Sequence, residues 1–163
     1  LHLVIRRQRQ MCIRDRRIDF WNLTAENNGA SPSATVEEQA GLYYFESNNV
    51  ESASGDVRCR NCSISGSTGQ GLLAVNSVDL WLEGLHLEDN NPTMPSFEVD
   101  NGDTMPGGAS GRVQVTNAHV EAETPGQPAV KFHRAAVEVN GLTMAGNHSG
   151  LEWRGDNLSL IHI

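Results

Sequence analysis

Three short segments of the sequence each carry two ionisable side chains separated by one residue. They are Glu98 with Asp100, Lys131 with His133, and Glu152 with Arg154. Together they supply what acid–base chemistry on a sugar polymer needs: a carboxyl acid or metal ligand, an amine or imidazole that removes a proton, and a guanidinium that holds a carboxylate. Paired carboxylates are also what glycoside hydrolysis requires. The candidate catalytic residues are Asp100, Lys131, His133 and Arg154, with Glu98 as an alternative acid.

Two aromatic residues, Tyr43 and Phe45, show the same alternate spacing. Aromatic faces pack on the apolar faces of sugar rings, so both are candidate substrate-binding residues, together with Glu98 and Glu152. A second interpretation stays open for the whole set. Acids and bases that alternate across neighbouring strands are typical of charge pairs on a solvated sheet face, and the aromatic residues could be covered by nearby loops.

A nine-residue pattern recurs five times and predicts the strands that position these side chains. Its first, third, sixth and eighth positions are apolar or small, so the apolar spacing slips from two to three within each unit. The units start at residues 18, 57, 80, 113 and 137 and read IDFWNLTAE, VRCRNCSIS, LWLEGLHLE, VQVTNAHVE and VEVNGLTMA. Each unit is predicted to be a short strand, a sharp bend and a second short strand.

The fifth position of every unit predicts the bend. It holds Asn22, Asn61, Gly84, Asn117 and Gly141 in turn. Only Gly, and to a lesser degree Asn, enters the left-handed backbone region at low cost. We expect these five residues to superimpose along one edge of the fold, with stacked Asn side chains hydrogen-bonded along the ladder.

A third strand signal accompanies each unit. It consists of the apolar pairs Leu42/Tyr44, Leu72/Ala74, Phe97/Val99, Val130/Phe132 and Leu151/Trp153. The pattern restarts after 39, 23, 33 and 24 residues, and the two shorter intervals approximate one coil of a solenoid. The extra residues fall in loop-like segments at 27–39, 47–56 and 100–111. The predicted fold is all-β, a parallel β-helix of about five coils with three short strands in each.

This organisation resembles the right-handed parallel β-helix, or pectin-lyase-like, superfamily, whose coils carry an Asn-rich bend between the second and third strands. The resemblance covers about residues 17–157 and implies a single-stranded, right-handed solenoid. It implies that the outer face of the first strand lines a substrate groove, and that the protein is extracellular or at the cell surface. The two outward columns of that strand are Tyr43, Leu73, Glu98, Lys131 and Glu152, and Phe45, Val75, Asp100, His133 and Arg154.

Both ends of the sequence differ from the repeats. Residues 1–16 (LHLVIRRQRQMCIRDR) and 158–163 (LSLIHI) resemble translated sequencing-adapter read-through. We expect them to be non-native segments that flank one β-helix domain at 17–157. On this expectation the chain is a fragment without its native caps, and its partners include the neighbouring coils of the parent chain, because each coil is stabilised chiefly by its neighbours.

The composition is strongly acidic. The full chain has 12 Lys and Arg and 20 Asp and Glu. Without the two end segments 12 − 5 = 7 basic and 20 − 1 = 19 acidic residues remain, a net charge of −12. Such a surface argues against nucleic-acid binding, which depends on neutralising phosphates, and resembles proteins of high-salt organisms. No apolar run is long enough to span a membrane.

Metal ligands are sparse in the pattern. Cys59 and Cys62 have the C-x-x-C spacing of zinc and redox sites, but both occupy apolar positions and no second ligand pair follows, so we expect them to point into the core. His86 and His119 share the outward seventh position, where a solvated polar face is favoured over a metal site. No metal site or cofactor is predicted, although calcium could bind at residues 100–104 (DNGDT).

Two classes of function follow from these residues. In the first, the chain is a fragment of a secreted or cell-surface β-helix protein that binds or processes polysaccharide, with a lyase, hydrolase or epimerase as the enzymatic options. In the second, it is a non-catalytic structural or adhesive β-helix segment of a larger surface protein. An open cleft that gathers the charged side chains favours an enzyme, whereas side chains paired off on a flat face favour the binding or structural interpretation.

Overall fold

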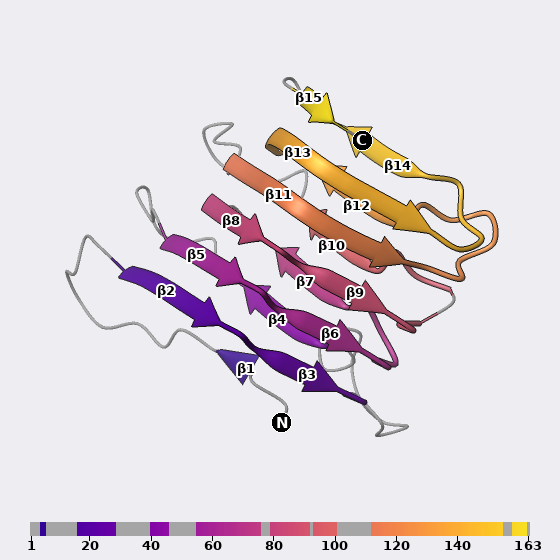
Figure 1. The fold of residues 1–163 in the computed structure, drawn as a ribbon, viewed down its shortest axis with the longest axis horizontal. Coiled ribbons are helices and arrows are strands. Elements are labelled where there is room, and N and C mark those ends of the chain that lie inside the picture. Colours follow the sequence, from indigo (N-terminus) through magenta and orange to yellow (C-terminus); the bar gives the residue numbers. More distant parts are fainter. Residues whose placement is uncertain are drawn as a thin grey trace.

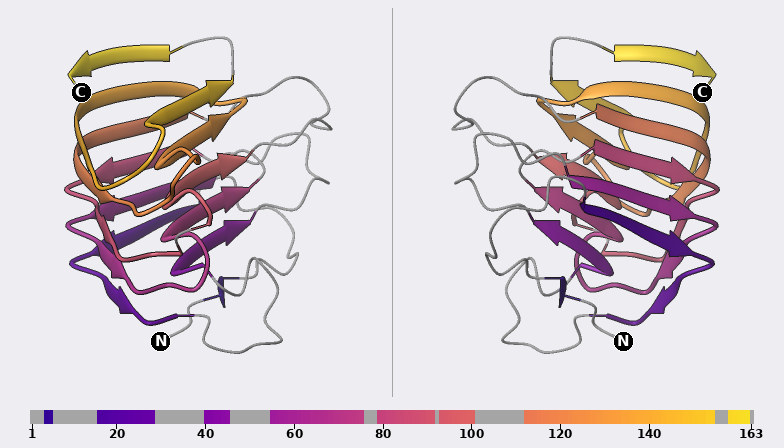
Figure 2. Two further views of the ribbon diagram at one scale, coloured as in Figure 1. Left: turned by 90° about the vertical axis from the view of Figure 1, so that its right-hand side faces the viewer. Right: turned by 90° about the vertical axis from the view of Figure 1, so that its left-hand side faces the viewer.

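The computed structural model describes residues 4–5, 16–28, 40–45, 55–75, 79–91, 93–100, 112–154 and 158–162. These residues form strands and turns, and none of them belongs to a helix that could cross a membrane. The strands make two all-parallel sheets that face each other across a common core (Figures 1 and 2). The chain passes from one sheet to the other and back as it rises from the N-terminal to the C-terminal end. The arrangement is β-solenoid-like.

Sheet A contains the predicted third strand of each unit, which confirms that strand signal. Its order is β1-β4-β7-β10-β12-β14. The bounds are β1 Val4–Ile5, β4 Leu42–Phe45, β7 Leu72–Val75, β10 Phe97–Asp100, β12 Val130–His133 and β14 Leu151–Arg154.

Sheet B contains the five nine-residue units and is strongly curled. Its strands are β2 Arg16–Trp21, β3 Thr24–Glu26, β5 Gly55–Arg60, β6 Ser63–Ser65, β8 Asp79–Glu83, β9 His86–Glu88, β11 Arg112–Glu121, β13 Ala136–Ala145 and β15 Leu158–His162. The first three units divide into two strands at the bend, as predicted. In the last two units β11 and β13 run through the bend as single strands, because their register continues from Thr116 opposite Asn140 to Ala118 opposite Leu142.

All five predicted bend residues have left-handed backbones, which confirms the basis of the repeat. Their φ angles are 52° at Asn22, 51° at Asn61, 65° at Gly84, 52° at Asn117 and 75° at Gly141. They occupy equivalent places in successive rungs, because the pairings on both sides of the bend keep one register. These five residues therefore form one corner of the fold, which runs from rung to rung between the two halves of sheet B.

Side chains and backbone both connect this bend ladder. The amide of Asn61 donates to Oδ1 of Asn22 at 3.3 Å, as expected for stacked Asn residues. The backbone N–H of Asn61 donates to the carbonyl of Glu83 at 2.8 Å, so the hydrogen-bond ladder continues through the bend. Gly84 leaves room for the amide beneath it, since a Cβ there would lie 2.8 Å from Oδ1 of Asn61. Gly141 has the same relation to Asn117, at 2.9 Å.

A second left-handed ladder lies directly after the nine-residue pattern and was not predicted. Its members are Asn27, Gly66, Asp89 and Gly146, with φ of 53°, 62°, 50° and 97°. The tenth position of the fourth unit, Ala122, is linked to the fifth unit by a 2.9 Å bond from its N–H to the carbonyl of Ala145. The chain thus turns away from sheet B at one position in each rung, and the repeat is at least ten residues long.

A third corner brings the chain into sheet A and requires small residues. Gly41 and Gly71 stand just before β4 and β7. A Cβ on Gly41 would lie 2.2 Å from a methyl carbon of Ile64, and one on Gly71 would lie 2.7 Å from the amide nitrogen of Asn90. Asn90 is buried and bridges two rungs, because it accepts from the N–H of Ser67 and donates to the carbonyl of Ile64.

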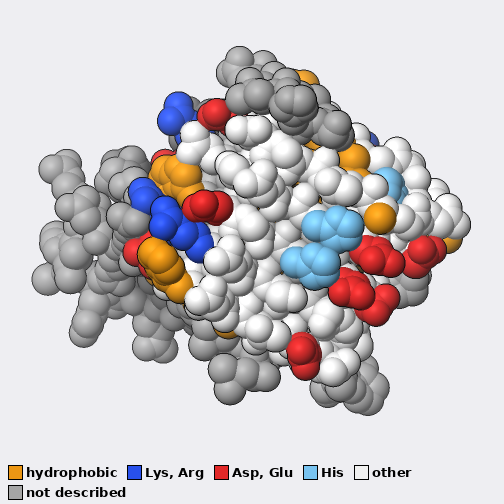
Figure 3. Space-filling model, viewed as in Figure 1, with side chains coloured by type: hydrophobic (Ala, Val, Ile, Leu, Met, Phe, Trp, Pro, Cys, Tyr) orange, Lys and Arg blue, Asp and Glu red, His pale blue; other side chains and the backbone are white. Residues whose placement is uncertain are grey.

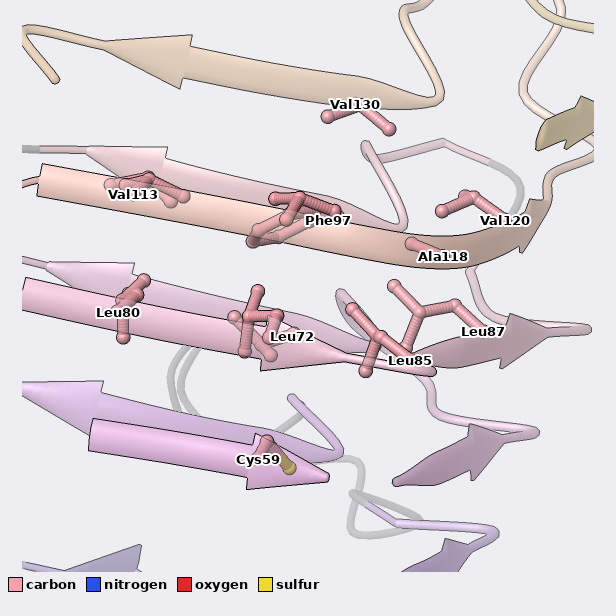
Figure 4. Close-up of a cluster of buried hydrophobic side chains, with 14 of the residues drawn as sticks. Cys59, Leu72, Leu80, Leu85, Leu87, Phe97, Val113, Ala118, Val120 and Val130 are labelled. Atoms are coloured by element: carbon pink, nitrogen blue, oxygen red, sulfur yellow. The ribbon is translucent and has the colours of Figure 1, made fainter. Parts of the chain in front are cut away.

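The core between the sheets consists mainly of the apolar positions of the nine-residue units and of the third strands, as predicted. Figure 4 shows side chains from both sheets directed into this space. Phe97 and Phe132 are fully buried and meet edge to face, with ring centroids 5.1 Å apart. Rows of Val, Leu and Ala fill the remainder, so each rung buries its apolar surface against the rungs above and below it.

The two segments expected to be non-native contribute strands at opposite ends of the stack. In β1, Val4 pairs with Tyr43 of β4. In β15, Leu158 pairs with Val137 of β13, and the register shifts between Val139 and Asn140. The origin of these segments and the domain boundaries at 17 and 157 stay predictions.

Gly84→Ala measures what the bend ladder contributes to stability. We expect this variant to lose about 2 kcal/mol of unfolding free energy, because it combines a left-handed Ala with a displaced Asn61 side chain. Gly126→Ala is the matched control, since Gly126 has φ of 78° but no atom within 4 Å of the added Cβ; it should lose about 1 kcal/mol. Urea unfolding midpoints compare the two, and equal losses would show that the contact with Asn61 contributes nothing.

Candidate functional site

The structure places the predicted site residues in two columns on sheet A. In the first column Tyr43, Leu73, Glu98, Lys131 and Glu152 pair in that order across β4, β7, β10, β12 and β14. In the second column Phe45, Val75, Asp100, His133 and Arg154 follow the same register. The predicted two-by-three set of charged residues therefore exists as an array on three adjacent rungs.

Glu98 and Lys131 form the most buried pair of the array. The Lys131 ammonium lies 2.6 Å from Oε1 of Glu98, and the amide of Gln70 donates to Oε2 at 2.9 Å. The Glu98 side chain is only 10% exposed, so these two partners compensate for the loss of water around its charge. The hydrogen bond to Glu98 raises the pKa of Lys131 above its ordinary value of 10.5. Lys131 is thus held in the protonated form, which works against its predicted role as a base.

The other two pairs of the array are more open to solvent. Nδ1 of His133 lies 3.0 Å from Oδ1 of Asp100, across adjacent rungs. Nε of Arg154 lies 2.8 Å from Oε1 of Glu152 on the same strand. Each charged side chain predicted for catalysis therefore contacts an oppositely charged or hydrogen-bonding neighbour. The catalytic roles stay predictions.

Part of the predicted site lies outside the described residues. The structure gives the backbone of Tyr43 and Phe45 but not the positions of their side chains, so the aromatic platform stays a prediction. The calcium option at 100–104 falls largely on residues that are not described. Leu73, between the aromatic and charged parts of its column, is 5% exposed.

Cys59 and Cys62 are buried in the core, as predicted, but they are joined by a disulfide. Their Cα atoms are 5.9 Å apart, because the left-handed residue between them turns the chain back on itself. The core location is therefore confirmed, and the disulfide is a feature that was not predicted. The sequence contained the signal: positions three and six flank the bend, and a bend brings their side chains together.

The His column on sheet B is also present. The rings of His86 and His119 stack with centroids 5.0 Å apart and an interplanar angle of 13°, and Nε2 of His86 lies 3.0 Å from Oε2 of Glu88. Figure 3 shows His side chains on this face, in pale blue, next to acidic side chains in red. Within the described part of the chain, no group of three or more His, Cys, Asp or Glu side chains is arranged to hold a metal.

A cluster on the other half of sheet B was missed at the sequence level. This Trp–Arg cluster consists of Trp21, Arg58, Arg60, Trp81 and Glu83 on β2, β5 and β8. The guanidinium carbon of Arg58 lies 4.7 Å from the centroid of Trp81, and that of Arg60 lies 4.9 Å from Trp21. The signal was the second and fourth positions of the nine-residue pattern, which point outward and hold these residues in successive units.

Comparison with known proteins gives no relatives from which to identify the chain. No protein-family model, characterised protein or solved structure matches it. The class of protein therefore rests on the fold itself, which is an all-parallel, β-solenoid-like arrangement with charged and aromatic ladders on its outer faces.

Lys131→Met is expected to lower the unfolding free energy by about 3 kcal/mol at neutral pH, because it leaves the buried Glu98 carboxylate without its cation. Arg154→Met is the matched control: its side chain is 71% exposed, and its loss should cost less than about 1 kcal/mol. Urea unfolding of both variants gives the comparison.

The same pair predicts a pH dependence. Because the folded pKa of Lys131 is raised, its stabilisation is present below 10.5 and is lost as the pH rises through the folded pKa. The stability difference between wild type and Lys131→Met should therefore shrink above pH 10.5. A constant difference across that range would contradict the assigned pairing.

Reduction of the Cys59–Cys62 disulfide should lower the unfolding free energy by about 2 kcal/mol, the loop-closure contribution of so short a loop. The measurement compares urea midpoints with and without dithiothreitol in a Cys12→Ser background, which prevents thiol exchange. The double variant Cys59→Ala, Cys62→Ala should be insensitive to the reductant. An unchanged midpoint in the parent chain would show that the bend alone fixes this corner.

Proposed function

We propose that the chain is a segment of a right-handed parallel β-helix protein of the pectin-lyase-like type, and that it binds polysaccharide on the outer face of sheet A without cleaving it. Two confirmed features support the architecture: the all-parallel sheets and the left-handed Asn and Gly ladder at one corner. About five rungs follow from the five units of the sequence.

The observation that carries this function is the pairing of the charged array on sheet A. Glu98 is committed to Lys131 and Gln70, and Glu152 to Arg154. A general base must accept a proton, and the contact with Glu98 keeps Lys131 protonated because it raises the pKa of Lys131. The same side chains, about 4.8 Å apart from rung to rung, form a row of donors and acceptors suited to sugar hydroxyls.

The disulfide supports a secreted or cell-surface location. Disulfides form and persist in oxidising compartments and are rare in the reducing cytosol. Cys59 and Cys62 are buried and bonded, and the chain carries a net charge of −8. An acidic surface keeps a protein hydrated outside the cell, where salt screens the repulsion between its carboxylates.

A polysaccharide lyase, hydrolase or epimerase is the second candidate, and one contact favours it. The carboxylate of Asp100 lies 3.0 Å from Nδ1 of His133, and such a contact orients an imidazole for proton transfer. In this function Asp100 positions His133, and Arg154 holds a carboxylate of the substrate.

Affinity electrophoresis of the chain through gels containing single polysaccharides, neutral and uronate-containing, tests the proposal. Retardation is expected in at least one gel, and Arg154→Gln should weaken it about fivefold, because one hydrogen bond from a charged donor is lost. Thr143→Ala, at an exposed position of β13 on the other side of the bend from the Trp–Arg cluster, is the control and should bind like the parent.

An assay for soluble products, run on the same polymers, separates the two candidates. Binding without product release supports the non-catalytic function. Release of products by the parent chain but not by Asp100→Asn would refute the non-catalytic function and support the enzyme. Failure of the folded chain to bind any polymer would refute the sheet A proposal.

A further inference from the structure

The outer face of sheet B carries an exposed aromatic surface that the proposed function does not use. Trp21 is 63% exposed and is the one large apolar side chain exposed among the described residues. It belongs to the Trp–Arg cluster. In Figure 3, hydrophobic, basic and acidic side chains gather at one side of the face of sheet B. Sheet A lies on the other side of the core, so this surface is separate from the charged array.

The parallel register arranges the cluster as two neighbouring columns. Trp21, Arg60 and Glu83 follow one another in the first column, and Asp19, Arg58 and Trp81 in the second. The aromatic rings are therefore two rungs apart, about 10 Å, and one outward position apart along the strands. A ligand that contacts both rings must contain several linked units.

The polar groups around the rings are held in fixed positions. Arg60 stacks on Trp21 and its Nε lies 2.9 Å from Oε2 of Glu83. Arg58 stacks on Trp81, and its buried Nε has no hydrogen-bond partner among the described residues. Planar donors locked beside aromatic rings lose little entropy when a ligand binds.

The charges of this surface select an uncharged ligand. The Arg60 guanidinium is neutralised by Glu83, and Arg58 lies in register with Asp19, which lies beside the cluster in the second column. The two columns together therefore carry no net charge. The whole chain carries −8, which repels a polyanion. Aromatic rings with hydrogen-bond donors and acceptors at their edges suit a molecule with apolar faces and a rim of hydroxyls.

We infer that the Trp–Arg cluster is a second glycan-binding site, and that it takes a neutral oligosaccharide or polysaccharide whose ring faces pack on Trp21 and Trp81. Hydroxyl groups of the glycan accept hydrogen bonds from Arg58 and Arg60 and donate to Glu83. This site does not depend on the proposed function of sheet A.

Tryptophan fluorescence gives the direct test, because the chain has three Trp residues and the third, Trp153, packs against the core. Titration with neutral gluco-oligosaccharides of increasing length should change the emission, with affinity rising with length. Trp21→Ala should weaken binding about tenfold, the loss of one aromatic contact. Trp153→Phe is the matched control and should retain the response, and circular dichroism verifies that each variant is folded.

Four outcomes would overturn the inference. The first is binding of oligogalacturonate that is tighter than that of neutral glycan and persists in Arg154→Gln. The second is unchanged affinity in folded Trp21→Ala, and the third is no response to any neutral glycan. The fourth is burial of Trp21 by self-association of the chain, detected by sedimentation. Arg154→Gln on sheet A separates the two sites: if it abolishes all glycan binding while Trp21→Ala has no effect, the sheet B site is refuted and the sheet A function stands.

Discussion

The left-handed bend is the constraint on which the rest of this structure depends. Parallel rungs can share hydrogen bonds only where their backbones follow one path, so every rung must turn at the same residue. Asn and Gly make that turn at low cost. Where a Gly follows an Asn in the next rung, the Asn side chain also has room to lie inside the corner. The Asn61 amide reaches down to Asn22 and has space above it only because Gly84 lacks a Cβ.

Because every rung follows the same backbone path, equivalent side chains stack in columns. The short distance within a column restricts which side chains can be neighbours. Neighbours in a column are about 4.8 Å apart, a distance at which like charges repel and opposite charges, stacked rings and cation–π pairs attract. The outer faces follow this rule in three forms: Glu98 with Lys131, His86 with His119, and Arg60 with Trp21. Pairing of this kind arises from stability alone, so a charged column is weaker evidence for catalysis than its composition suggests.

The sequence predicted the parts of the fold that depend on spacing. Apolar alternation located the strands of sheet A, and the fifth position located the bend ladder, because both are fixed by backbone geometry. The second ladder was not predicted, because Asp89 and Ala122 interrupt the series of Asn and Gly at the tenth position. Asn27 and Gly66 do fit the preference of Asn and Gly for left-handed backbones. Spacing also set the register of the charged array, but it could not show that Gln70, from a corner, completes the shell around Glu98.

The two outer faces differ in a way that bears on function. On sheet A the polar array includes the nearly buried Glu98, whose hydrogen bond raises the pKa of Lys131 and so opposes the use of that amine as a base. On sheet B the Trp–Arg cluster leaves Trp21 largely in water, although burying an indole elsewhere would stabilise the fold. An exposed aromatic ring whose neighbours are ordered by ion-pair and cation–π contacts is typical of a ligand-binding surface. The aromatic face is therefore a stronger indication of ligand binding than the charged face that the sequence first brings to notice.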